Sequence, residues 1–177
     1  MIWTLDLNLK TTFVTPSVKN VLGYAPEERM RQEPCDQMTP ASYERVIEHL
    51  AGELQRENEP GIDPDRTITI EIEYYHKNGS IVWLENNISA IRDDKGSLIG
   101  LYGVSRDITG RKKVEESLKE SEERYRLIFE NVTDVVYSLD RELRVKSVSP
   151  FVEKILGYTP EELIGRQIHE LNVLDPL

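Results

Sequence analysis

The feature that most constrains the fold of this chain is an internal repeat. Val21–Glu28 reads VLGYAPEE, and Ile155–Glu162, about 134 residues later, reads ILGYTPEE. Ile2–Asp6 (IWTLD) and Val136–Asp140 (VYSLD) align at the same offset. A long repeat identifies the unit of folding before any helix or strand is assigned. We therefore expect the chain to begin the same folding unit twice.

Each copy of the repeat carries the signals of two strands followed by two short helices. Its first segments alternate apolar and polar residues, as half-buried strands do. Gly23 and Gly157 are placed to end a helix in the left-handed conformation. Pro26 and Pro160 then suit the first turn of the next helix, where the missing N–H costs little. The local signals agree with the repeat.

The segment between the copies predicts one long helix and three further strands. Apolar residues spaced three or four apart predict a helix over Pro40–Glu57. Alternating residues predict strands over Arg66–His76, Ile81–Arg92 and Leu98–Ile108, with Asn78-Gly79 as a hairpin turn. Together with the two N-terminal strands, they predict an α+β domain built on one five-stranded antiparallel sheet.

Residues 110–131 predict a connector helix. Apolar residues recur there at alternating spacings of four and three, which is the pattern of a coiled-coil seam. The seam positions are Val114, Leu118, Ser121, Tyr125 and Ile128. A parallel homodimer is the favoured interpretation, and a solvated spacer helix is the alternative.

The repeat and the connector divide the chain into three parts. We expect a first domain at 1–109, the connector at 110–131 and the opening of a second domain at 132–177. This second copy stops before any counterpart of the three later strands. We therefore expect the chain to be a fragment of a longer protein.

Charge and composition exclude several classes of function. A formal net charge of -10 disfavours nucleic acid as a partner. No apolar run reaches the roughly 18 residues that a membrane helix needs, so we expect a cytoplasmic fragment without membrane contact. The single cysteine, Cys35, excludes an internal disulfide and cannot alone form a structural zinc site. No nucleotide-binding or cyclase motif occurs, so we expect no catalytic residue and no metal site.

Three motifs, in their order along the chain, resemble the PAS family in its bacterial sensory-box form. They are the LGYxPEE segment of both copies, His76–Ser80 (HKNGS) followed by Trp83-Leu84-Glu85, and Gly103–Thr109 (GVSRDIT). The resemblance implies a PAS fold in which Asp107, Ile108 and Thr109 leave the last strand and pass a signal to the connector helix. It also implies a sensory or regulatory module of a multidomain signal-transduction protein, above all a sensor histidine kinase.

The same resemblance implies a ligand pocket between the inner face of the sheet and the long helix. Alternation along the strands, aligned with the family, gives the pocket residues Leu84, Asn86, Ile88, Leu101, Gly103 and Ser105 from the sheet, with Val46 and Leu50 from the helix. Asn86 and Ser105 would be polar anchors in an apolar cavity, as small-molecule sites often need. A filled core without a ligand is an equal alternative.

The residues that cofactor-binding relatives use are largely missing. Flavin-binding relatives carry an amide and a glutamine at the positions of Leu84 and Ser105, and the motif around Cys35 is not that of the photoactive relatives. Haem-binding relatives use a histidine on the long helix, and His49 lies there, but beside the apolar stripe, as a surface histidine would. We therefore favour no cofactor. A haem- or flavin-bearing redox or gas sensor and a ligand-free dimerisation spacer stay open as alternatives.

Overall fold

The computed structural model describes residues 1–56, 61 and 63–170. The chain divides into two compact units, Met1–Lys113 and Val114–Leu177, and each is described by itself. Glu57, the predicted end of the long helix, and the tail at 171–177 lie outside the described residues.

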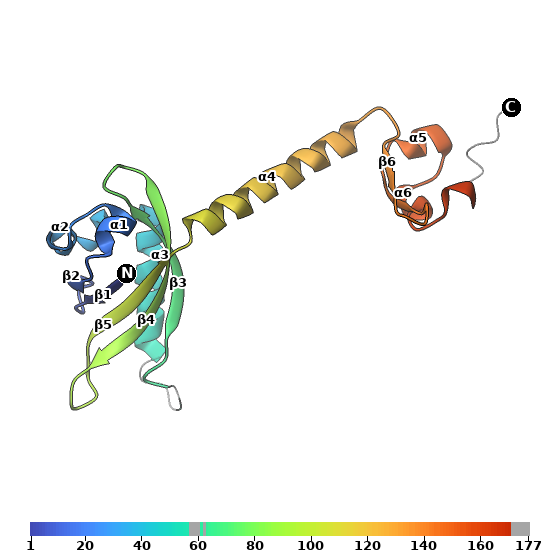
Figure 1. Cartoon of the computed structure of the whole chain (residues 1–177). Helices are drawn as coiled ribbons and strands as arrows, with labels where there is room; N and C mark the ends of the chain where they lie inside the picture. Colours follow the sequence, from blue (N-terminus) through green and yellow to red (C-terminus); the bar gives the residue numbers. More distant parts are fainter. Residues whose placement is uncertain (57–60, 62, 171–177) are drawn as a thin grey trace. The chain divides into compact units, whose positions relative to one another are not determined.

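The first unit contains one antiparallel sheet with strands in the order β2-β1-β5-β4-β3. The strands are β1 (Ile2–Leu5), β2 (Thr11–Val14), β3 (Ile68–Tyr75), β4 (Ile81–Arg92) and β5 (Leu98–Asp107). The helices are α1 (Val18–Leu22), α2 (Pro26–Arg31), the 3-10 turn η1 (Pro34–Asp36) and α3 (Pro40–Arg56), and Figure 1 shows them on one face of this sheet. The predicted α+β domain with a five-stranded antiparallel sheet covered by short helices is confirmed.

The core of the first unit lies between this sheet and the helices. It consists of Trp3, Val14, Val18, Leu22, Met38, Ile72, Tyr74, Val82 and Leu84, all of them buried. Strand β1 lies between β2 and β5, so the start of the chain pairs with its last strand, and Trp3 stands opposite Gly103. This pairing is long-range, and it carries Trp3 onto the inner face of β5.

Two of the motifs that are far apart in the sequence pack against each other. Gly23 ends α1 with a φ of 79°, and Lys77 donates its backbone N–H to the Leu22 carbonyl at 2.9 Å. A Cβ at Gly23 would approach the His76 ring to 2.7 Å, so only glycine fits without a shift. Lys77 also pairs with Glu28 at 2.6 Å. The LGYxPEE segment and the HKNGS hairpin are therefore packed and hydrogen-bonded against each other.

A connector helix, α4 (Thr109–Asn131), follows β5 almost immediately. The second unit then contains β6 (Tyr137–Leu139), β7 (Val145–Val148), α5 (Val152–Leu156), α6 (Pro160–Leu163) and the 3-10 turn η2 (Ile168–Glu170). Strands β6 and β7 form an antiparallel pair, and Val145, Val148, Val152 and Leu163 form a small core beside it.

The two copies of the repeat share unusual backbone details. Leu9 and Leu143, 134 positions apart, both adopt a positive φ, of 64° and 61°. Asp6 and Asp140 each accept two backbone N–H groups from the turn that contains this leucine. Side chains rarely tolerate this region of φ, so its presence in both copies shows that the repeat extends to backbone conformation.

In the part of the chain that the structure describes, no helix combines the length and the apolar character needed to cross a bilayer.

Candidate functional site

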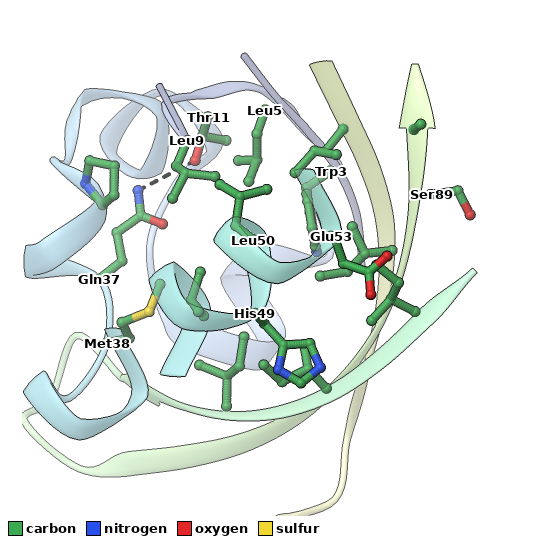
Figure 2. Close-up of a pocket in the computed structure, with 18 of the residues that line it drawn as sticks. Trp3, Leu5, Leu9, Thr11, Gln37, Met38, His49, Leu50, Glu53 and Ser89 are labelled. Carbon is green, nitrogen blue, oxygen red and sulfur yellow. Dashed lines mark hydrogen bonds between the residues drawn. The ribbon is translucent and has the colours of Figure 1, made fainter. Parts of the chain in front are cut away.

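A cavity of about 130 Å³ lies between α3 and the inner face of the sheet in the first unit. Figure 2 shows its lining, with Trp3 and Leu5 from β1, Leu50 from α3, and Leu9 and Met38 from the connecting segments. A cavity of about 150 Å³ in another protein is large enough to bind benzene. The present cavity therefore has room for one small ring or a short aliphatic chain.

Four of the eight predicted pocket residues line this cavity. They are Val46 and Leu50 from α3, Ile88 from β4 and Leu101 from β5. The other four, Leu84, Asn86, Gly103 and Ser105, are buried but are absent from its lining. The two predicted polar anchors lie outside the lining because a side chain from β1 covers that part of β4 and β5.

The covering side chain is Trp3. A Cβ at Gly103 would overlap the Trp3 ring, so the indole lies directly on the glycine backbone of β5. The indole Nε1–H donates to Ser105 Oγ at 2.7 Å, and the Ser105 hydroxyl donates to Asn86 Oδ1 at 2.6 Å. Asn86 Nδ2 in turn donates to the Leu84 carbonyl at 3.0 Å. Asn86 and Ser105 thus satisfy each other and the indole, which leaves neither side chain directed at a ligand.

The polar side chains at the cavity are mostly paired with one another. Gln37 donates to Thr11 Oγ1 at 3.3 Å, the bond drawn in Figure 2. Arg66 binds the Glu53 carboxylate at 2.7 Å. His49 is exposed, as predicted for a surface histidine, yet its side chain also lines the cavity.

The volume of the cavity favours a small ligand over the large cofactors of the fold family. A porphyrin or a flavin ring system is several times larger than benzene, which a cavity of about 150 Å³ accommodates. No group of three His, Cys, Asp or Glu side chains in the described residues is arranged to hold a metal ion. A small organic molecule is the class of ligand that the observed volume admits.

Among the cavity residues that sequence reasoning missed, Arg29 on α2 carries a charge and is buried. This side chain is only 4% exposed, lines the cavity, and lies with its guanidinium carbon 5.1 Å from the centre of the Tyr74 ring. Its side chain donates one hydrogen bond, to Gln32 Oε1 at 3.1 Å. Burial lowers the pKa of Arg29 and raises the pKa of Tyr74. A signal was present in the repeat, because position 29 corresponds to an apolar residue, Leu163, in the second copy.

Hydrogen bonds at the exit of β5 join the sheet to the first turn of α4. Ile108 is 6% exposed, and its backbone N–H donates to the Trp83 carbonyl at 2.9 Å. The Trp83 N–H donates to Thr109 Oγ1 at 3.0 Å, and Asp107 Oδ1 accepts the Thr109 N–H at 2.8 Å. The three predicted transmission residues therefore make a tight junction with strand β4.

The first turn of α4 is also held by charges on the outer face of the sheet. Arg111 and Lys112 each bind the Glu71 carboxylate at 2.6 Å. Hydrogen bonds from Lys112 and then Arg111 lower the pKa of Glu71. The Lys112 ammonium lies 4.9 Å from the Trp83 ring centre, and Arg45 of α3 lies 5.9 Å from a centre of the same indole. Trp83 therefore contacts both the cavity-lining helix and the connector.

The remainder of α4 exposes several large apolar side chains. None of its residues is buried. The four apolar seam residues Val114, Leu118, Tyr125 and Ile128 are 58–70% exposed. In proteins, a helix gains most of its stability when its apolar face packs against another element. The seam is therefore a face without a partner within the described residues.

Comparison with known proteins identifies the family. Residues 1–110 match the model of the PAS domain, and residues 123–175 match the model described as the PAS fold. The first match covers more than half of the chain, so the chain belongs to the PAS family. It is a PAS sensor module of the kind found in signalling proteins.

Its relatives are much longer proteins. The chain is 24% identical over 178 residues to the sensor protein FixL of Bradyrhizobium diazoefficiens, with 98% of this chain and 32% of FixL covered. It is 27% identical over 135 residues to the uncharacterized protein y4lL of Sinorhizobium fredii, with 76% of this chain and 15% of that protein covered. The chain thus spans about a third or less of these relatives.

Solved structures share the fold. The crystal structure of a sensory box histidine kinase/response regulator from Burkholderia thailandensis superposes with a TM-score of 0.54 at 22% identity. The match covers 71% of this chain and 88% of that one. At this identity the likeness establishes the fold and nothing finer.

Proposed function

We propose that this chain is the input module of a multidomain signalling protein, first of all a sensor histidine kinase. In this proposal a small molecule binds in the cavity of the first unit, and α4 carries the resulting change onward. The chain performs no reaction itself. Similarity to FixL over nearly the whole chain supports a sensor protein as the setting.

The observation that carries the proposal is the contact chain around Trp83. The cavity-lining helix α3 reaches this indole through Arg45, and the connector reaches it through Lys112. The backbone of Trp83 also holds Ile108 and Thr109 at the junction. A shift of α3 on ligand binding would therefore act on the residues that fix the first turn of α4.

The second part of the proposal is that α4 pairs with α4 of a second copy in parallel. The exposed seam supports this, because burying it would supply the packing that the isolated helix lacks. Ser121, a polar residue in the middle of the seam, limits the stability of the pair. We expect an equilibrium between monomer and dimer that responds to concentration.

Substitution of Leu118 by aspartate tests the dimer. Two leucine side chains leave the seam in the symmetric pair, and each buried leucine contributes about 1.5–3 kcal/mol. Dimerisation should weaken by more than about tenfold, since about 1.4 kcal/mol corresponds to a factor of ten. Native mass spectrometry and sedimentation equilibrium measure this change, and the mass spectra also report any small molecule retained by the protein.

Leu127→Asp is the matched control. Leu127 lies on the same helix with 64% exposure, against 58% for Leu118, but it is outside the seam. It loses the same side chain and suffers the same change in helix propensity. A protein that stays monomeric at all concentrations, or one in which both variants weaken the dimer equally, contradicts pairing through this seam.

A further inference from the structure

The cavity contains a buried cation that the fold itself does not require. At the position of Arg29, the second copy of the repeat has Leu163, which is 2% exposed in the core of that unit. An apolar residue therefore completes this position of the fold. Replacing it by a guanidinium at 4% exposure carries a desolvation penalty unless an anion or several hydrogen bonds compensate it.

The described residues supply only part of that compensation. A guanidinium has five N–H donors, and the side chain of Arg29 donates one hydrogen bond, to Gln32. Tyr74 adds a favourable cation–π contact at 5.1 Å, but its ring carries no negative charge that would balance the guanidinium. No carboxylate of residues 1–56, 61 and 63–170 pairs with Arg29. The other two guanidinium nitrogens, Nε and Nη2, are not fully enclosed by protein atoms, and Arg29 belongs to the lining of the cavity.

The rest of the lining favours a ligand with an apolar body. Ile72, Ile88, Leu50, Leu101 and Met38 are among the side chains around the cavity. The carboxylate of Glu53 is held by Arg66, so this acid is already neutralised by a cation of its own. Arg29 is therefore the lining cation that has no carboxylate partner among the described residues.

We propose that the cavity binds a small organic carboxylate with an apolar body about the size of one ring, and that Arg29 pairs with its carboxylate. Guanidinium and carboxylate match in planar, two-point geometry. The volume of about 130 Å³ matches a body about the size of benzene. This inference rests on the proposed sensory function, because it names the chemical class of the ligand for the same cavity.

Benzoate and benzyl alcohol test the inference on the unaltered chain. They have the same ring, but only benzoate carries a carboxylate, and acetate has the carboxylate without the ring. Titration followed by NMR shifts of the amides around the cavity should show benzoate binding at least tenfold more tightly than benzyl alcohol, and acetate more weakly than benzoate. Equal affinity for benzoate and benzyl alcohol overturns the role of the cation. Binding of acetate as tight as benzoate overturns the apolar body.

Arg29→Leu places the residue of the second copy into the first. We expect this variant to lose at least tenfold in benzoate affinity while benzyl alcohol binds within about twofold of its original affinity. Arg31→Leu, which removes an exposed arginine from the same helix, is the matched control and should change neither affinity. If Arg29→Leu does not fold, Arg29→Lys, which keeps the charge, decides the question. The inference is overturned unless this lysine variant still binds benzoate more tightly than benzyl alcohol.

The two proposals fail in different ways. If neither ring compound binds the unaltered chain, the cavity is not a small-molecule site, and the sensory part of the proposed function fails together with the inference. If both compounds bind with equal affinity, the cavity is a binding site and only the inference about Arg29 is wrong.

Discussion

At the scale of single residues, alternation along a strand identified the inner face but not what covers it. The spacing of Asn86 and Ser105 places both on the inner side of the sheet, and both are buried there. What removes them from the cavity is Trp3, 102 residues before Ser105, and its position depends on the pairing of β1 with β5. No local pattern contains that information. Arg29, in contrast, could have been found by comparing the two copies residue by residue.

Ser105→Ala tests the buried polar network at this scale. The substitution leaves the Trp3 indole N–H and Asn86 Oδ1 without their partner in a buried site. An unsatisfied buried polar group costs about 1–3 kcal/mol, so the free energy of unfolding should fall by about that amount in urea titrations. Ser97→Ala, at an exposed serine before β5, should change it by less than about 0.5 kcal/mol. Equal stability of the two variants would show that Ser105 has no structural role.

At the scale of elements, the sequence predicted most boundaries closely. Strand β4 begins and ends where the alternating pattern and the Asn78-Gly79 turn placed it, at Ile81 and Arg92. The first strand after the long helix is shorter than predicted, because its regular pairing with β4 covers Ile68 to Tyr75. The connector helix begins at Thr109 rather than Gly110. These shifts at the ends reflect side-chain caps and pairing, which hydrophobic periodicity does not encode.

Low pH should loosen the junction between the sheet and α4. The folded protein lowers the pKa of Glu71 from its ordinary value of 4.5, through hydrogen bonds from Lys112 and Arg111. The stabilisation is therefore complete above about pH 4.5 and is lost as the pH falls through the depressed value. Both partners are partly exposed, so it amounts to no more than about 1 kcal/mol.

Hydrogen exchange of the amides in the first turn of α4 measures this loss. In Glu71→Gln these amides should exchange faster at neutral pH than in the unaltered protein, and the extra loosening between neutral and acidic pH should disappear. Glu116→Gln, at an exposed position further along α4, should behave like the unaltered protein. If Glu71→Gln shows the same acid-dependent loosening as the unaltered protein, another group controls the junction.

At the scale of the whole molecule, the repeat predicted that a second unit begins after the connector, and residues 123–175 match a PAS model of their own. Each unit has a separate hydrophobic core. Among its described residues, the second unit has a core of four buried apolar residues and a two-stranded sheet. Such a small core gives little stability, so the two units should differ strongly in their resistance to unfolding.

Matched leucine truncations test whether the units unfold independently. Leu22 in the first core is 0% exposed, and Leu163 in the second is 2% exposed. Each change to alanine should cost about 2–5 kcal/mol in the unit that contains it, and distant sites without shared partners should not affect each other. Hydrogen exchange followed by mass spectrometry should show faster exchange in β4 and β5 for Leu22→Ala, and in β6 and β7 for Leu163→Ala. Helix α4 begins in the first unit and continues in the second, so loss of protection in both units for either variant would mean that the two units are coupled in stability through this helix.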